Sequence, residues 1–182
     1  MSRRLASGPR RRGGYAPRSW WSEDWRVARD QRLDAMLHGL LRVAGFLGRP
    51  PTWHRSVPIG LHVVNLQKSQ FGNQYYLNFG IYVADLGDLT APRAHQCHFN
   101  ARVDVRDRAD ERLWKHVLDL DRPMEPEARA QSLDALLQRS LIQPLDRLRS
   151  LDDMRRAHVE GWLPGGLMAK SLRTSLDAGQ VP

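Results

Sequence analysis

Two side chains in the middle of the chain have the chemistry of an enzyme that acts on a small anion, namely His98 and Arg102. An imidazole changes its charge near neutral pH and can serve as a general acid or base, while a guanidinium can hold a carboxylate or phosphate. The sequence offers no nucleophile beside a base, no paired carboxylates and no phosphate-binding loop to complete the set. We therefore predict no catalytic residue, and an enzyme is the less favoured interpretation.

The stretch around these two residues alternates polar and apolar side chains, which is typical of strands with one wet face. Asn, Gln, Tyr, His and Arg dominate the polar positions, and these side chains make hydrogen bonds of fixed geometry. A face that is only solvated usually carries Lys, Glu and Thr, although plain solvation remains the alternative interpretation. The predicted binding face consists of Asn65, Gln67, Tyr76, Asn78, Tyr82, His98, Asn100 and Arg102.

The sequence His95-Gln96-Cys97-His98 contains the residue types that bind zinc. Strand alternation would place Cys97 and His98 on opposite faces, so only His95 and Cys97 could converge, and no second pair of ligands is evident. We predict no metal site and no cofactor. Cys97 is the single cysteine of the chain, and we expect it to be a small buried apolar residue within a strand.

Four predicted strands would position these side chains, at residues 53–57, 61–68, 74–84 and 96–105. These runs are rich in Val, Ile, Phe and Tyr, and short turns between the first three favour an antiparallel meander. One face should hold Tyr75, Leu77, Phe79, Ile81 and Val83 of the third strand with Cys97, Phe99, Ala101, Val103 and Val105 of the fourth.

Leucines at helical spacing predict an amphipathic helix over residues 30–46, which we expect to cover that apolar face. Further helices are predicted at 110–120, at 127–151 with a break at Pro144, and more weakly at 166–176. The fold class is thus α+β: a four-stranded antiparallel meander packed on an N-terminal helix, with C-terminal helices. The sequence leaves open whether those last helices cover the apolar or the polar face.

The net charge of +8 belongs mainly to the N-terminus, because residues 1–29 hold eight arginines and two acidic residues, and the rest of the chain carries only +2. Residues 1–22 predict a disordered basic tail, and residues 23–182 a single domain. Such a tail could contact nucleic-acid phosphates, through Arg3, Arg4, Arg10, Arg11 and Arg12. We see neither an export signal nor a membrane-spanning run, so we expect a cytoplasmic protein without a membrane partner.

Three segments of the predicted sheet resemble the bacterial DUF4304 family, and the resemblance covers about residues 30–150. They are Val64-Asn65-Leu66-Gln67-Lys68-Ser69, Tyr76-Leu77-Asn78-Phe79-Gly80-Ile81-Tyr82 and Cys97-His98-Phe99-Asn100-Ala101-Arg102. The resemblance implies a domain of unknown biochemical function, with no catalytic residues to transfer.

Small bacterial α+β domains also recur as immunity proteins that neutralise a cognate toxin, an analogy of fold alone. We therefore favour a protein-binding module, with toxin immunity as its most specific form. Nucleic-acid binding through the tail, and an enzyme acting on a small anion through His98 and Arg102, remain the alternatives.

Overall fold

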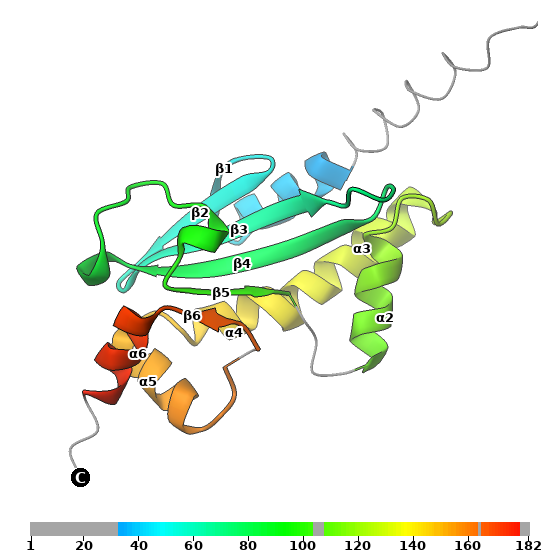
Figure 1. Ribbon diagram of the computed structural model, residues 1–182. Helices are drawn as coiled ribbons and strands as arrows, with labels where there is room; N and C mark the ends of the chain where they lie inside the picture. Colours follow the sequence, from blue (N-terminus) through cyan, green and yellow to red (C-terminus); the bar gives the residue numbers. More distant parts are fainter. Residues whose placement is uncertain (1–32, 104–107, 164, 179–182) are drawn as a thin grey trace, which may run out of the picture.

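The computed structural model describes residues 33–103, 108–163 and 165–178. Residues 33–43 are helical, whereas the basic tail of residues 1–22 and the predicted start of this helix lie outside the described residues. Strands with short connections follow as far as residue 102, and helices then make up most of the chain. In Figure 1 the labelled helices lie below the sheet, and the connection between β4 and β5 rises on the opposite side.

Six strands form one antiparallel sheet in sequence order. They are β1 (Leu47–Arg49), β2 (Thr52–Val57), β3 (Gly60–Lys68), β4 (Tyr75–Val83), β5 (Phe99–Arg102) and β6 (Leu167–Met168). The predicted α+β class and the antiparallel pairing are confirmed, but the prediction of four strands is wrong. The three-residue β1 and the two-residue β6 are too short to show the two-residue period that identifies a strand.

The fourth predicted strand is shorter than expected. Its first residue, Gln96, instead belongs to the 3₁₀ turn η2 (Ala94–Gln96), and Cys97 caps that turn. Cys97 was expected beside Phe99 on the apolar face, and this is wrong: it packs with Val63 and Tyr82 of the opposite face. Alternation cannot be extended through a turn, because the turn rotates the side-chain directions. Residues 104–107, including Val105, lie outside the described residues.

The helical half of the chain contains several short helices. They are α2 (Arg108–Val117), α3 (Pro126–Leu137), α4 (Gln143–Asp146), α5 (Leu151–Val159) and α6 (Lys170–Asp177). The predicted helix at 127–151 is interrupted by a π-helical turn, Gln138–Ile142, and Pro144 lies in the first turn of α4, where its missing N–H costs little. No helix in the described ranges is both long and apolar enough to cross a membrane.

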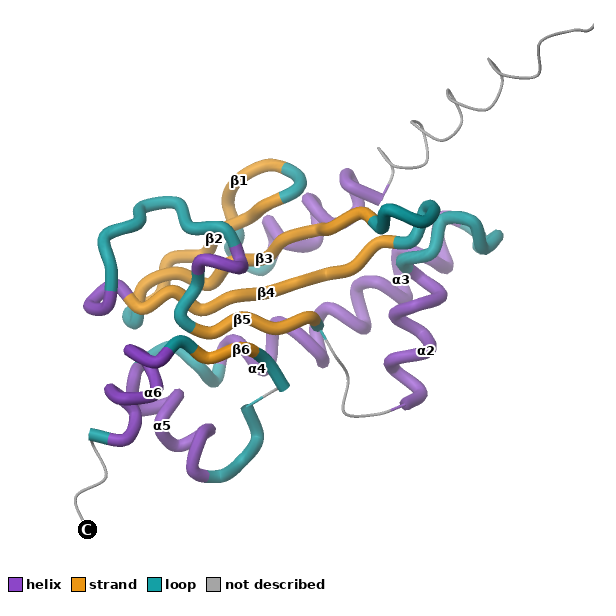
Figure 2. Tube along the Cα trace, in the orientation of Figure 1, coloured by secondary structure: helices purple, strands orange, loops and turns teal. Residues whose placement is uncertain are grey.

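The main hydrophobic core lies on one face of the sheet. Alternate residues of β4 from Tyr75 to Val83 are buried there, as the two-residue period predicts. The same buried cluster includes Leu37 of the helix at 33–43, Leu136 of α3 and Leu172 of α6. The C-terminal helices therefore cover the apolar face, which the sequence had left open (Figure 2).

A loop of residues 84–98, called here the covering loop, folds over half of the opposite face. It begins with the 3₁₀ turn η1 (Ala84–Leu86) and ends after η2. Its Ala94 and Cys97 form a small second buried cluster with Val63 and Tyr82 of the sheet. The strand residues below this loop are consequently shielded from solvent, whereas the rest of the face stays open.

Candidate functional site

The register of the sheet aligns polar side chains from neighbouring strands in a row on the open half of this face. Asn65 of β3 pairs with Asn78 of β4, which in turn pairs with Arg102 of β5. In the other direction, Asn65 pairs with Thr52 of β2, and Thr52 pairs with Arg49 of β1. Five adjacent strands span about 19 Å. An arginine therefore stands at each end of a row of amide and hydroxyl groups.

A second, shorter row consists of Gln67 and Tyr76, which are paired across β3 and β4. The two rows contact each other, because the Asn78 Nδ2 donates to Gln67 Oε1 over 3.0 Å and the Arg102 guanidinium lies 4.1 Å from the Tyr76 ring centroid. We name the seven residues of both rows the polar shelf: Arg49, Thr52, Asn65, Gln67, Tyr76, Asn78 and Arg102.

The polar shelf is accessible and ordered by its own contacts. Arg49, Gln67 and Arg102 are exposed, and its other members are half-buried. Asn65 Nδ2 donates to Thr52 Oγ1 over 3.0 Å, which adds a contact between β2 and β3. Amide and guanidinium groups held in this way keep part of their hydrogen-bonding capacity for a ligand.

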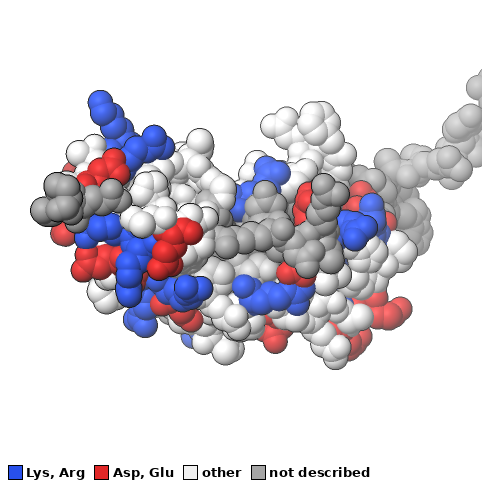
Figure 3. All heavy atoms as spheres, turned by 90° about the horizontal axis from the view of Figure 1, so that it is seen from below, with Lys and Arg blue, Asp and Glu red and all other residues white. Residues whose placement is uncertain are grey.

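The helical side of the molecule has a different surface. Figure 3 shows lysines and arginines interspersed with acidic residues there. Several of these charges pair along one helix, such as Arg156 with Asp153 in α5. Short-range pairs of this kind are typical of an ordinary solvated surface and contribute little to binding.

Tyr82 and His98, which were predicted to belong to the binding face, lie in its covered half: Tyr82 lies under the covering loop, and His98 is the last residue of that loop. The Tyr82 side chain is only 4% exposed, and its hydroxyl accepts a hydrogen bond from the Leu89 N–H over 2.8 Å. His98 Nδ1 accepts from the Val83 N–H over 3.1 Å, and its Nε2 then donates to the Leu86 carbonyl over 3.2 Å. The two rings are in contact with their centroids 4.7 Å apart and their planes tilted by 39°. Both side chains hold the covering loop onto the sheet.

Asn100 lies between the two halves of the face. It pairs with Gly80 of β4 and is half-buried. Arg102 lies four positions after His98 in the sequence, which is about 13 Å along an extended chain. The structure therefore does not bring the imidazole and the guanidinium to one reacting centre.

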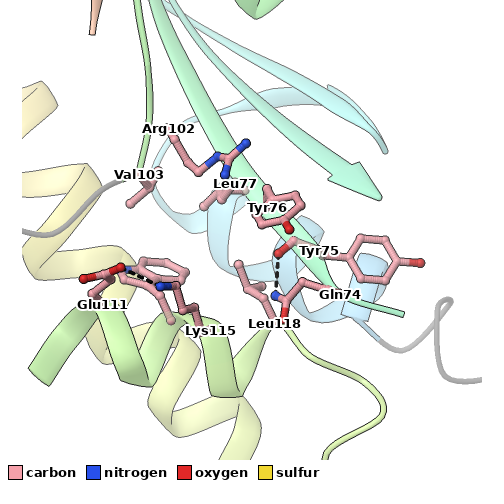
Figure 4. A pocket seen from close by; sticks show the side chains of 10 residues that line it. Gln74, Tyr75, Tyr76, Leu77, Arg102, Val103, Glu111, Lys115 and Leu118 are labelled. Atoms are coloured by element: carbon pink, nitrogen blue, oxygen red, sulfur yellow. Dashed lines mark hydrogen bonds and ion pairs between the residues drawn. The ribbon is translucent and has the colours of Figure 1, made fainter. Parts of the chain in front are cut away.

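A pocket of about 200 Å³ adjoins the polar shelf, where β4 and the end of β5 meet α2. Figure 4 shows Arg102 and Tyr76 on its sheet side and Glu111 and Lys115 on its helix side. The Lys115 ammonium pairs with a Glu111 carboxylate oxygen 2.6 Å away. The pocket is lined by Gln74, Tyr75, Tyr76, Leu77, Arg102, Val103, Glu111, Trp114, Lys115 and Leu118.

The position of α2 beside this pocket is set by backbone hydrogen bonds beyond its C-terminus. The Tyr75 N–H donates to the Leu118 carbonyl over 2.8 Å, and the Leu120 N–H donates to the Asn73 carbonyl over 3.0 Å. These bonds attach the chain after α2 to the start of β4. The backbone hydrogen bonds therefore fix the spacing of α2 and β4, and with it the pocket between them.

Comparison with known proteins identifies the family of the chain. Residues 37–147 match the family model DUF4304, a domain of unknown function. The chain belongs to the DUF4304 family. The matched part of this DUF4304 protein contains the whole polar shelf and the whole pocket, whereas α5, β6 and α6 lie beyond it. No curated protein and no solved structure matches the chain.

Sequence reasoning missed two members of the polar shelf of this DUF4304 domain, Arg49 and Thr52. Arg49 follows a glycine and precedes two prolines, so nothing marks it as part of a strand, and Thr52 lies one residue outside the predicted strand. The pocket was also missed. The spacing of Glu111 and Lys115 predicts an ion pair on one side of a helix. The packing of α2 beside the sheet, which creates the pocket, has no such sequence pattern.

Cys97 of the DUF4304 domain is a buried thiol. Burial raises its pKa to about 12, so the thiolate that binds metals and attacks electrophiles is scarce at neutral pH. Within the described residues, no three His, Cys, Asp or Glu side chains come together as metal ligands would. His95, its possible neighbour in a metal site, is exposed.

Proposed function

We propose that this DUF4304 domain is a protein-binding module and that the polar shelf is the surface that contacts its partner. The observation that carries the proposal is the pre-ordered row of amide, hydroxyl and guanidinium groups on an otherwise open sheet face. Side chains that are already held in place lose little conformational entropy when a partner binds. Arg102 and Tyr76 are also residue types that often dominate the binding energy of protein interfaces.

An exposed aromatic side chain beside the polar shelf supports the same proposal. Phe71 lies in the turn between β3 and β4, and its side chain is 97% exposed. Gln67 and Tyr76, the nearest shelf residues along the two strands, pair just below this turn. A large apolar ring beside ordered polar groups is a combination that protein interfaces use.

The alternative of an enzyme working through His98 and Arg102 has less support. Both ring nitrogens of His98 are engaged with backbone groups of the covering loop and of β4. A general acid or base needs a nitrogen within hydrogen-bonding reach of a substrate. Arg102 lies on the other side of Asn100, in the open half of the face.

In its most specific form, the proposal is a cytoplasmic immunity protein that neutralises a cognate toxin. The support is indirect and consists of the small α+β domain, the absence of an assembled catalytic site among the described residues, and an ordered contact surface. A toxin-like reading frame next to the gene, and protection of cells that express that toxin, are the expected results. Cells that die equally fast with and without this protein would contradict toxin immunity.

The nucleic-acid alternative depends on the basic tail, which lies outside the described residues. Binding that is led by arginines on phosphates should weaken steeply as salt is raised. A titration of the full chain and of a chain lacking residues 1–22 with generic DNA and RNA separates this alternative from the polar shelf.

The test of the polar shelf uses two triple variants of the full chain. The shelf variant is Gln67→Ala, Asn78→Ala and Arg102→Ala, and the control variant replaces exposed helix residues, Gln131→Ala, Asp134→Ala and Arg173→Ala. A partner captured by the wild-type chain should bind the shelf variant at least about tenfold more weakly, because interface residues of these types often contribute 2 kcal/mol or more.

The control variant should keep the wild-type affinity, and thermal melts should show that both variants are folded. Equal affinity of the shelf variant and the wild type would overturn the assignment of this surface.

A further inference from the structure

We propose that the pocket between β4 and α2 binds a carboxylate carried on an apolar body. This inference deepens the proposed function and rests on it, because Tyr76 and Arg102 belong both to the polar shelf and to the pocket lining. The pocket would then be the place where one side chain of the partner is anchored, with an acidic group beside it.

The inner lining of the pocket suits an apolar group. Leu77 of β4, Val103 after β5 and Leu118 after α2 supply hydrocarbon surface, and the volume of about 200 Å³ suits a group the size of one side chain. Binding sites that anchor a partner commonly combine an apolar depression with a polar rim. The pocket has this composition, with Arg102, Gln74 and Lys115 among its polar residues.

Arg102 is the side chain of the lining that would bind the anionic part of the ligand. One face of its guanidinium rests on the Tyr76 ring, 4.1 Å from the ring centroid, which orients the group and leaves its N–H edge available. Arg102 has no carboxylate partner among the described residues, whereas the other pocket cation, Lys115, is paired with Glu111. A guanidinium edge fits a carboxylate through two parallel hydrogen bonds.

A second observation, independent of Arg102, also indicates a missing acceptor. Trp114 lines the pocket, is only 4% exposed, and has an indole Nε1–H with no hydrogen-bond partner among the residues that the structure describes. Buried donors are nearly always paired, because an unpaired one costs about 1–3 kcal/mol. A carboxylate bound in the pocket would offer an acceptor oxygen to this N–H.

The charge of the lining favours a carboxylate over a phosphate. The described lining residues that are charged at neutral pH are Arg102, Lys115 and Glu111, and pairing of the last two leaves one net positive charge. One positive charge balances a monoanion, whereas a dianionic phosphate would bring an uncompensated charge into a partly apolar site.

The test is a titration of the ¹⁵N-labelled full chain with phenylacetate, which combines an apolar ring with a carboxylate. The readouts are the Trp114 indole N–H signal, assigned with Trp114→Phe, and the Arg102 Nε–H signal. Phenylacetamide, the neutral analogue, and inorganic phosphate are titrated in parallel. We expect saturable shifts with phenylacetate and at least about tenfold weaker binding of phenylacetamide, since hydrogen bonds to charged groups contribute about 1.5–3 kcal/mol.

Two matched variants test whether Arg102 is the cation that binds the carboxylate. Arg102→Gln should weaken phenylacetate binding about tenfold and leave phenylacetamide binding unchanged. Arg173→Gln, at an exposed position of α6 outside the polar shelf and the pocket lining, should change neither. Absence of a saturable Trp114 shift, equal affinity for acid and amide, or equal shifts with phosphate would each overturn the proposal.

The outcomes also separate this proposal from the proposed function. If the shelf variant loses its protein partner but phenylacetate does not bind, the pocket proposal fails and the protein-binding function stands. If phenylacetate binds while partner capture does not depend on the polar shelf, the protein-binding surface fails and the ligand is a free small carboxylate. Displacement of a captured partner by phenylacetate would show that the partner supplies the carboxylate.

Discussion

The thiol of Cys97 packs directly against the backbone of Gly80. A Cβ atom placed on Gly80 would lie 2.6 Å from the Cys97 Sγ and 3.0 Å from the Ala94 carbonyl oxygen. Glycine at this position of β4 therefore lets the covering loop approach the sheet closely. The chemistry of the cysteine follows from that contact, because the thiol is enclosed between loop and strand.

We expect Cys97 to react slowly with thiol reagents in the folded protein. Its pKa is raised to about 12 by burial, so at pH 8 the reactive thiolate is roughly a thousandfold scarcer than in an unfolded chain with an ordinary thiol. Stopped-flow or steady-state measurements with a chromogenic disulfide reagent test this. The guanidinium-unfolded chain serves as the fast control, and equal rates in both states would contradict the prediction.

At the scale of single residues, the sequence predicts which face of β4 each side chain lies on, but not whether that side chain is open to solvent or covered. The alternation of β4 correctly separated Leu77 and Phe79 from Tyr76 and Asn78, because a regular strand fixes which residues share a face. It could not distinguish the open Tyr76 from the covered Tyr82, since both are polar aromatic residues at equivalent positions. The difference arises because the covering loop packs on Tyr82, through Leu89, Ala94 and Cys97.

At the scale of elements, the covering loop is held by a few specific hydrogen bonds rather than by a large core. Its second buried cluster contains two residues of its own, Ala94 and Cys97. The remaining attachments include the hydroxyl of Tyr82 and the ring of His98. Segments with few buried apolar contacts open more readily than the core does.

We expect Tyr82→Phe to loosen this loop selectively. The substitution removes the hydroxyl that accepts from the Leu89 N–H, and the loss of one such bond should lower the free energy of unfolding by about 1 kcal/mol. Hydrogen exchange of the Leu89 amide should accelerate more than exchange in β4. Tyr76→Phe is the matched control, since its ring contact is with Arg102, and an equal effect of both changes would contradict the role given to Tyr82.

The errors in the predicted elements have physical causes. The fourth predicted strand began too early because the alternation of polar and apolar residues continues back through Cys97 to Gln96, although these two residues belong to a turn. The pocket beside α2 depends on long-range bonds such as Tyr75 to Leu118. Such bonds are set by tertiary packing and leave no local pattern to read.

At the scale of the whole molecule, a buried polar link joins the sheet to the C-terminal half of the chain. His62 of β3 is fully buried on the core side and accepts at Nδ1 from an Arg55 guanidinium nitrogen 3.2 Å away. Its Nε2 donates to the Leu148 carbonyl over 2.8 Å, and Arg55 also pairs with Asp146 over 2.8 Å. The uncharged imidazole of His62 therefore links the sheet to the segment that contains Asp146 and Leu148.

We expect this link to make the protein less stable in mild acid. Burial lowers the pKa of His62 from its ordinary 6.5 to about 4, so between these values the unfolded chain binds a proton that the folded chain does not. The contribution is fully present above pH 6.5 and is lost as the pH falls toward 4, by up to about 3 kcal/mol.

Urea unfolding from pH 7.5 to 4.5 measures this loss. His62→Leu should lower stability at neutral pH but flatten its pH dependence in this window. His95→Gln, a change at an exposed histidine, should leave the pH dependence as it is. An unchanged slope in His62→Leu would rule out this residue as its source.

The two outermost strands of the sheet have a consequence for how the molecule associates. β1 has three residues and β6 has two, so an incoming chain would find almost no template of free backbone groups along either border. Lateral growth of the sheet, the usual route by which exposed borders cause aggregation or capture extended peptides, is thereby disfavoured. A protein partner of the kind proposed would then contact side chains of the sheet face rather than backbone groups at its borders.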